Sequence, residues 1–195
     1  MIEATGEDAF SRPVRRVVTG HDETGRSIIV SDGQTTTHHA SGGSGMTIYD
    51  LWETFEAPAP MTAMEDDPTA VPLHFGIPTI GVRIRIAEIP PAGERAPFMH
   101  RTESIDTILV LRGEMTMLID DAEVVLRAGD TLVQRGTDHA WVNRSGAPCR
   151  ILFIIIGGRM TEALKQTLGI ETIEWDPRDG GTGHRANEQA GGAGG

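Results

Sequence analysis

The sequence is poor in cysteine, in basic residues and in long apolar runs, and each shortage excludes a class of protein. One cysteine, Cys149, excludes an intrachain disulfide and fits a reducing cytoplasm. In 195 residues, 17 Lys and Arg stand against 28 Asp and Glu, and the net charge of -11 repels nucleic acid and anionic lipid. The longest apolar run, Ile151 to Ile156, is too short for the roughly 20 residues of a membrane span. The first ten residues carry acids where a signal peptide needs a basic start. We therefore expect a cytoplasmic protein with neither nucleic-acid nor membrane partners.

Helical periodicity is also scarce, whereas 24 Gly and 11 Pro indicate many strands and turns. After His100, six short β-prone segments follow one another between Gly or Asp-Asp turns: TILVLRGE, MTMLID, AEVVLRAGD, TLVQRG, HAWVN and CRILFIII. This rhythm is typical of an antiparallel sandwich or barrel. Only residues 159–168 predict a helix, because Met160, Leu164 and Leu168 recur at every fourth position.

The predicted organisation has four parts. Residues 1–79 form an N-terminal strand and loop extension that packs on the barrel, with a loop at 35–45 and an irregular, Pro-rich stretch at 57–78. The barrel core occupies residues 80–157. Residues 158–176 hold the C-terminal helix and a strand-like segment, and 177–195 form a flexible, Gly-rich tail with too little apolar surface to order itself.

The informative stretch holds two spaced motifs. They read Gly93-x6-His100-x-Thr102-x3-Asp106-x6-Gly113 and Gly129-Asp130-x3-Gln134-x-Gly136-x2-His139-x3-Asn143. Together they resemble the two motifs of the cupin superfamily, and the neighbouring segments resemble its small single-domain, conserved-barrel members. The resemblance implies an all-β fold, a double-stranded β-helix (jelly-roll) barrel, here with the N-terminal strand extension and one C-terminal helix.

Three positions depart from the family pattern. Thr102 replaces the second histidine of the first motif, Asp106 replaces its glutamate, and Gln134 replaces the proline of the second motif. The resemblance therefore implies a metal site of three residues, His100, Asp106 and His139, instead of the usual four.

Strand geometry supports a shared site at these positions. Residues two apart on a strand face the same side, so His100 lies on one face with Thr102, and His139 with Trp141 and Asn143. If the two motif strands pair across a barrel, His100, Asp106 and His139 converge inside its mouth. Two imidazoles and a carboxylate suit Fe, Mn, Ni, Co or Zn and leave positions open for substrate or oxygen.

Alternative interpretations of these residues stay open. In one interpretation, the histidines are satisfied core residues and Asp106 hydrogen-bonds a neighbouring turn. A metal-free mechanism would use His139 or His100 as general base, oriented by Asp106, with Thr102 or Asn143 donating to a developing oxyanion. Glu103 is a rival carboxylate, although it lies on the opposite strand face from His100.

Further residues are candidates for substrate contact. Arg85 shares a strand face with Arg83, and from the inner face of the barrel it could bind a carboxylate or enolate. The alternative is a solvated outer face or a dimer surface. The other substrate-pocket candidates are Gln134, Trp141 and Asn143.

The leading functional hypothesis is metal-assisted proton transfer on a small organic acid or carbonyl compound by an isomerase, dehydratase, decarboxylase or other lyase. His100, Asp106, His139 and Thr102 are its catalytic candidates. An Fe(II)-dependent dioxygenase is the runner-up, and a metal-free acid–base cupin or a non-catalytic ligand-binding protein remains possible. A homodimer is expected, since short edge strands and the N-terminal extension need cover.

Overall fold

The computed structural model describes residues 13–35, 38–40, 45–63, 65–72, 76–78, 80–94 and 96–170. Within these ranges the protein is almost entirely β, as the sequence predicts. The elements are β1 (Arg15–His21), β2 (Ser27–Gln34), β3 (His38–Ala40), β4 (Thr47–Thr54), β5 (Val82–Ile89), β6 (Ser104–Arg112), β7 (Glu114–Ile119), β8 (Ala122–Arg127), β9 (Thr131–Arg135), β10 (Ala140–Val142), β11 (Cys149–Gly157) and α1 (Glu162–Leu168).

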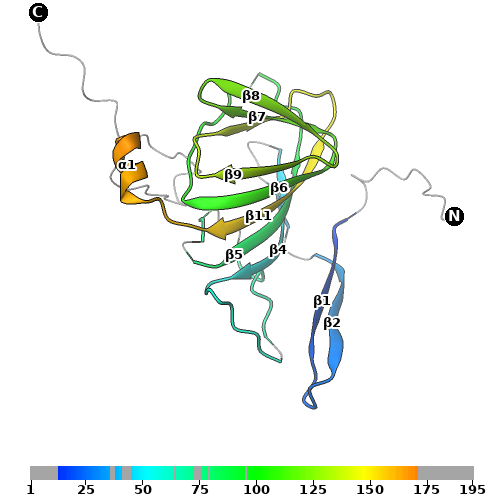
Figure 1. Ribbon diagram of the computed structural model, residues 1–195. Helices are drawn as coiled ribbons and strands as arrows, with labels where there is room; N and C mark the ends of the chain where they lie inside the picture. The colour runs from blue at the N-terminus through cyan, green and yellow to red at the C-terminus, as the bar shows by residue number, and fades with distance from the viewer. Residues whose placement is uncertain are drawn as a thin grey trace, which may run out of the picture.

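Two antiparallel sheets face each other and form the barrel (Figure 1). The larger sheet has the strand order β3-β4-β5-β11-β6-β9, and the smaller one the order β10-β7-β8. The last strand, β11, lies between β5 and β6 and pairs with both. Because strands distant in the chain are neighbours in the sheet, this is a jelly-roll arrangement, and the predicted fold class is confirmed.

Alternation along the strands fills one end of the barrel with apolar side chains. On β6 the even-numbered residues are buried and point inward, and on β11 the odd-numbered residues do the same. The resulting cluster, which we call the apolar end, consists of Ile108, Val110, Met115, Leu126, Cys149 and Ile151. Burial of these side chains from water is the main stabilising contribution to this part of the fold.

The turn from β6 to β7 requires glycine. Gly113 has φ of 82°, in the left-handed region that favours glycine. A Cβ at this position would lie 2.8 Å from the carbonyl oxygen of Pro148, a distance at which backbone atoms would have to shift. This motif glycine therefore lets the hairpin approach the start of β11.

The N-terminal part contributes more to the barrel than the sequence indicates. The predicted core begins at residue 80, but β4 belongs to the large sheet and pairs with β5 along its length. The predicted loop at 35–45 contains the strand β3, which pairs with β4. The β1–β2 hairpin instead stands apart from the barrel (Figure 1). Arg16 joins it to the barrel by donating to the Leu51 carbonyl at 3.1 Å and pairing with Asp67.

The predicted C-terminal helix begins three residues later than expected. Thr161 caps it by accepting a hydrogen bond from the Leu164 backbone N–H at 3.3 Å, and Gly169 ends it in the left-handed conformation. Leu164 and Leu168 are exposed, while Met160, just before the helix, is buried. Within the described ranges no helix is long and apolar enough to cross a membrane. The predicted tail, 177–195, and residues 171–176 lie outside the described residues.

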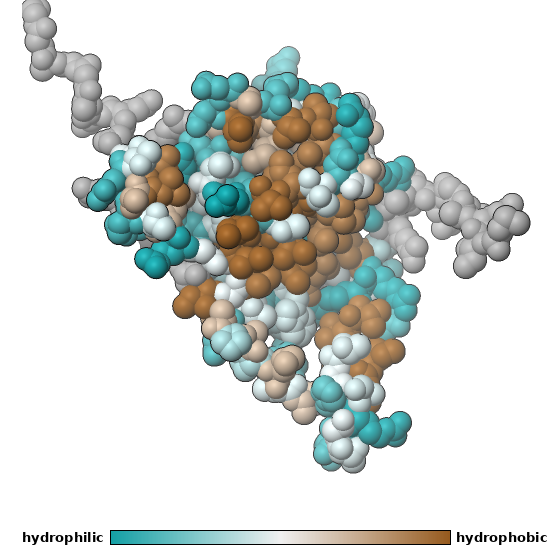
Figure 2. Space-filling model, viewed as in Figure 1, coloured by the Kyte–Doolittle hydropathy of each residue, from teal (hydrophilic) through white to brown (hydrophobic). Residues whose placement is uncertain are grey.

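The outer face of the large sheet is also apolar. Figure 2 shows hydrophobic side chains gathered over this face of the barrel. Its strands β6, β9 and β11 present residues that are 40–60% exposed, namely Ile105, Leu111, Val133 and Ile156. A continuous apolar surface on a sheet face is a feature of association sites.

Candidate functional site

The two motif histidines lie opposite each other at the other end of the barrel. His100 and His139 form an isolated antiparallel bridge, in which each backbone N–H donates to the other residue's carbonyl at 2.9 Å. Opposed residues of such a pair place their side chains on the same face. The two imidazole centroids are accordingly 4.3 Å apart, with the rings tilted by 47°. The sequence expectation that these histidines converge agrees with this geometry.

Backbone carbonyls fix the orientation of both rings. Nδ1 of His139 lies 2.9 Å from the Thr137 carbonyl, and Nδ1 of His100 lies 3.2 Å from the Phe98 carbonyl. A carbonyl can only accept, so we assign the ring proton to Nδ1 in both residues. In the neutral ring Nε2 is then the acceptor, which is the nitrogen that takes a proton or binds a metal.

Burial keeps both imidazoles neutral. Removal from water lowers the pKa of His139 to about 4, with a smaller contribution from the nearby His100. Burial lowers the pKa of His100 in the same way. Near neutral pH the pair therefore carries no charge and presents two basic nitrogens.

A carboxyl group and a carboxamide lie on neighbouring strands at the same end of the barrel. Asp106 on β6 is opposite Gln134 on β9, and the side chains are 7% and 2% exposed. Among the described residues, neither Oδ1 of Asp106 nor Oε1 of Gln134 has a hydrogen-bond partner. Burial raises the pKa of Asp106 to about 6, and an interaction with Ser104 opposes that rise. Unpartnered buried oxygens are costly, which makes this end of the barrel the candidate site.

Hydroxyl and amide groups connect these residues. The Ser104 hydroxyl donates to Oγ1 of Thr102 at 2.9 Å, so both hydroxyls belong to the row that leads to Asp106. On the other side, Nε2 of Gln134 donates to the Thr137 carbonyl at 3.2 Å and lies 3.3 Å from Nδ1 of His139. We call the set His100, Thr102, Ser104, Asp106, Gln134 and His139 the polar end of the barrel.

The expected three-ligand metal set is not gathered at the polar end. Within the part of the chain that the structure describes, no three His, Cys, Asp or Glu side chains lie close enough to hold one ion. The paired histidines offer two good nitrogen ligands, but two ligands hold first-row divalent ions poorly. Metal binding by His100, Asp106 and His139 stays a prediction.

The structure places the remaining substrate-pocket candidates differently from one another. Arg85 points into the barrel, where its Nε and Nη2 contact Oδ1 of Asp50 at 3.0 Å and 2.8 Å. Trp141 also faces inward, edge-on to His139, with ring centroids 6.1 Å apart. Asn143 is fully buried, but its amide nitrogen donates to the carbonyls of Ile89 and Ala147. Its role in this structure is to hold the turn before β11.

The rival carboxylate, Glu103, has other partners. Its Oε1 accepts the Met160 backbone N–H at 3.0 Å and lies 3.7 Å from Nζ of Lys165. Glu103 therefore anchors the segment that leads into α1.

Several inward-facing groups escaped the sequence reasoning. Asp50 and Glu53 of β4 form buried ion pairs with Arg85 and Arg83 of β5. The sequence pattern that could have revealed these ion pairs is two acidic residues on one β-prone segment and two arginines on a second β-prone segment. Phe98 stacks on His100 at a centroid distance of 5.3 Å, and it carried no signal because it lies in a loop.

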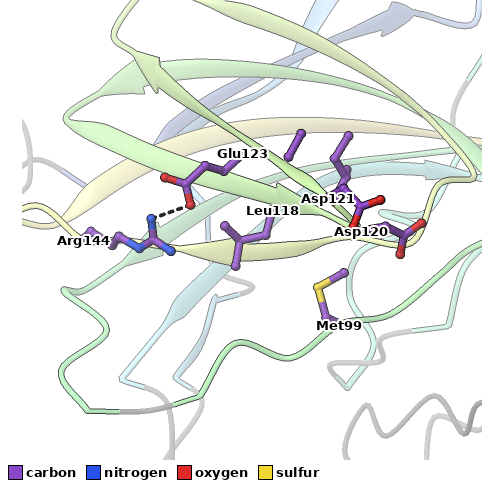
Figure 3. A pocket seen from close by; sticks show the side chains of 8 residues that line it. Met99, Leu118, Asp120, Asp121, Glu123 and Arg144 are labelled. Atoms are coloured by element: carbon purple, nitrogen blue, oxygen red, sulfur yellow. Dashed lines mark hydrogen bonds and ion pairs between the residues drawn. The ribbon is translucent and has the colours of Figure 1, made fainter.

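A separate hollow of about 660 Å³ lies beside the β7–β8 turn (Figure 3). Its walls carry Asp120 and Asp121, and Arg144 across it is paired with Glu123 at 2.8 Å. None of the residues of the polar end lines it. We therefore place the candidate site at the polar end, where the unpartnered buried groups are.

Comparisons with known proteins agree with the barrel. The family model of the cupin domain matches residues 85–155. The phomopsin biosynthesis cluster protein C' of Diaporthe leptostromiformis is 32% identical over 165 residues, which cover 81% of this chain and 86% of that protein. The cupin-domain-containing oxidoreductase fogC of Aspergillus ruber is 33% identical over 153 residues, 75% of this chain and 73% of that protein.

A solved cupin domain, that of Cnp3 from Schizosaccharomyces pombe, superposes with a TM-score of 0.43 at 9% identity and covers 83% of this chain and 98% of that domain. The family assignment comes from the family model and the sequence relatives. The chain belongs to the cupin family.

Proposed function

We propose that this cupin is a small-molecule enzyme that catalyses proton transfer at the polar end of its barrel. The observation that carries the proposal is the pair of buried, unpartnered oxygens on Asp106 and Gln134, beside two neutral histidines. Such groups cost stability without a ligand, and they are arranged to contact one. Isomerisation, dehydration and other lyase steps all use this chemistry.

Asp106 is the acid–base group in this proposal. Its ionised form takes a proton from an acidic C–H of the substrate, and its protonated form returns the proton to a second atom of the same molecule or to the leaving group. A carboxyl with a pKa of about 6 is suited to both directions near neutral pH. Nε2 of His139 accepts a substrate hydroxyl, and the Thr102 hydroxyl can donate to developing negative charge.

The experiment measures exchange of acidic C–H hydrogens in D2O by proton NMR, with 2-tetralone as the probe ketone. The wild type should accelerate exchange by about 100-fold or more, the lower end for general acid–base catalysis. Asp106→Asn should lose that acceleration. Glu103→Gln is the matched control, because it makes the same change three residues away and should keep it. Undiminished exchange by Asp106→Asn would refute the role of Asp106.

An oxidoreductase is the second candidate, and the names of relatives such as fogC favour it. Its test is the metal content of protein purified without a His tag, together with oxygen uptake. A bound first-row metal that disappears in His100→Ala and in His139→Ala would support this candidate and the predicted ligands.

A second copy of the chain is the partner we propose for the apolar outer face. The projecting β1–β2 hairpin also exposes apolar side chains, Val17 at 47% and Ile29 at 63%. An isolated two-stranded hairpin is marginally stable alone, so docking on another barrel would support it. Light scattering should give twice 21.0 kDa, and a monomer at micromolar concentration would contradict this.

The single cysteine, buried as a thiol, supports a reducing compartment such as the cytoplasm.

A further inference from the structure

The charges around the polar end bear on what kind of molecule can bind there. Arg85 is held by Asp50, and Arg83 by Glu53, both as ion pairs inside the barrel. At the mouth, Arg101 lies 3.9 Å from Asp138. The two guanidinium groups inside the barrel are each matched by a carboxylate of the chain, whereas Nε of Arg101 at the mouth has no hydrogen-bond partner among the described residues. His139 is buried, His100 is half-buried, and both imidazoles are neutral near pH 7. A substrate carboxylate would have to break one of these pairs, at the cost of leaving a buried acid unmatched.

Among the buried side-chain atoms of the polar end, those without a hydrogen-bond partner are acceptors. Oδ1 of Asp106 and Oε1 of Gln134 are buried oxygens without a donor. Nδ1 of His139 is committed to the Thr137 carbonyl, so its Nε2 is an acceptor as well. A ligand that satisfies these atoms must bring hydrogen-bond donors. For a neutral molecule, the simplest such donor is a hydroxyl group.

A row of rings leads from the surface into this end of the barrel. Phe98, which is 44% exposed, stacks on His100 with an angle of 18° between the rings. The row continues through His139 to Trp141, and Trp141 lies edge-on to Phe153 with centroids 5.8 Å apart. Flat faces and ring edges of this kind favour a flat, conjugated ligand over a puckered, saturated one.

From these three observations we propose that the substrate is a neutral, flat, conjugated molecule with a hydroxyl group, of the phenol or enol class. The hydroxyl donates its one hydrogen bond to Oδ1 of Asp106 or to Oε1 of Gln134, and the conjugated ring lies against the row that begins at Phe98. This inference narrows the substrate class of the proposed proton-transfer site and rests on that site being the binding site. The sequence suggested a small organic acid or a carbonyl compound, and the proposed class differs from the acid in carrying no charge.

Four probes of similar size test the three properties separately in calorimetric titrations at pH 7. The reference is 2-naphthol, which is flat, neutral and hydroxylated. The comparisons are 2-methoxynaphthalene without the donor, 2-naphthoate with a negative charge, and decahydro-2-naphthol without the flat ring. We expect 2-naphthol to bind at least tenfold more tightly than each of the others. Equal affinity for any one of them overturns the corresponding property, and no binding of 2-naphthol at millimolar concentration overturns the proposal.

Two variants locate the bound probe. Phe98→Leu should weaken 2-naphthol binding several-fold, because it removes the outermost ring, while Phe55→Leu, at an exposed phenylalanine after β4, should leave it unchanged. Gln134→Met should weaken binding of 2-naphthol but not of 2-methoxynaphthalene, since it removes the Oε1 acceptor, and the lost Nε2 donor serves the Thr137 carbonyl and neither probe. Unchanged 2-naphthol affinity in both Phe98→Leu and Gln134→Met would place the probe elsewhere.

The proposed substrate class and the proposed catalytic role of Asp106 can be refuted independently of each other. Asp106→Asn should still prefer 2-naphthol over 2-naphthoate, because the ring row and the ion pairs remain. Preference for 2-naphthol together with undiminished proton exchange by Asp106→Asn would keep the substrate class and reject the role of Asp106. If the protein did not prefer 2-naphthol but proton exchange still depended on Asp106, the substrate class would be rejected and the role of Asp106 kept.

Discussion

The two ends of one barrel interior have opposite chemistry although they share strands. On β6, Ile108 and Val110 belong to the apolar end, and Ser104 and Asp106 to the polar end. β9 and β11 run between the same ends. The apolar end is closed by packing, whereas the polar end holds buried oxygens without partners, and Phe98 next to His100 is 44% exposed. The difference teaches that burial at the apolar end stabilises the barrel, whereas the unpartnered oxygens of the polar end cost stability, as expected for the site that we propose there.

The largest expected effect breaks an ion pair near the polar end. Glu53→Gln leaves the Arg83 guanidinium buried without its charge partner, and both side chains are less than 10% exposed. We expect a loss of about 3–5 kcal/mol in the free energy of unfolding, measured by urea denaturation. The double variant Glu53→Met with Arg83→Met should recover most of it. A loss under about 1 kcal/mol in the single variant would show that the pair is solvated.

At the apolar end, Ile151→Ala should cost about 2–5 kcal/mol of unfolding free energy, because Ile151 is fully buried. Ile156→Ala on the outer face of the same strand should cost less than about 1 kcal/mol. The rate of proton exchange per folded molecule should stay the same in both. A selective loss of exchange in Ile151→Ala would contradict the division of the barrel into two ends.

Two groups of the polar end make opposite contributions to the pH dependence of stability. The folded Asp106 carboxyl, with its pKa raised from 3.8 to about 6, binds a proton that the unfolded chain has lost, so its contribution falls as pH rises through 6. His139, with its pKa lowered from 6.5 to about 4, makes stability rise with pH over the same range. In the wild type these two effects largely offset each other between pH 4 and 6.

Asp106→Asn should remove this compensation. Its unfolding free energy should rise by about 3 kcal/mol between pH 4 and 6.5, because only the histidine contribution remains. Urea denaturation at five pH values measures both proteins. Parallel pH profiles for the variant and the wild type would show that the pKa of Asp106 is not raised.

Thr102 occupies the position of the missing motif histidine. Of the changes considered, its substitution by histidine should have the smallest effect on the free energy of unfolding. Thr102→His should add an imidazole beside the histidine pair and raise affinity for a divalent ion, measured by competition with a chelator. Proton exchange should fall, because the added ring fills space that the substrate uses. Unchanged metal affinity in a folded variant would mean that residue 102 does not face His100.

The fold followed from the sequence because local signals agree with it. Gly113 sits where the turn requires a left-handed residue, and Arg83 and Arg85 share one face of β5, as the alternation predicted. The role of β4 in the barrel was not predictable. Its partners in β5 lie 28 or more residues away along the chain, and the sequence of neither strand specifies which strand it pairs with. The strand β3, three residues long, is too short to leave a periodic signal.

The site was predictable only where the motif spacing carries it. The convergence of His100 and His139 was predicted from the alternation of side chains along a strand and from the assumption that the two motif strands pair. The commitment of Arg85 to Asp50 did not, because it depends on which residue of β4 lies opposite, and a bulge shifts that register. The same holds for Asn143, whose side chain is used by backbone carbonyls that the sequence does not place nearby.

The bridge between His100 and His139 is a single rung, held by two backbone hydrogen bonds and extended by no further pairing of the His100 segment. A single bridge opens at far lower free energy than a full strand pairing. We therefore expect this end of the barrel to unfold locally while the rest stays folded. The amide hydrogens of these two residues should exchange with solvent faster than those of β11. Each opening separates the imidazoles, and the rate of that separation sets an upper limit on how fast a ligand passes between them.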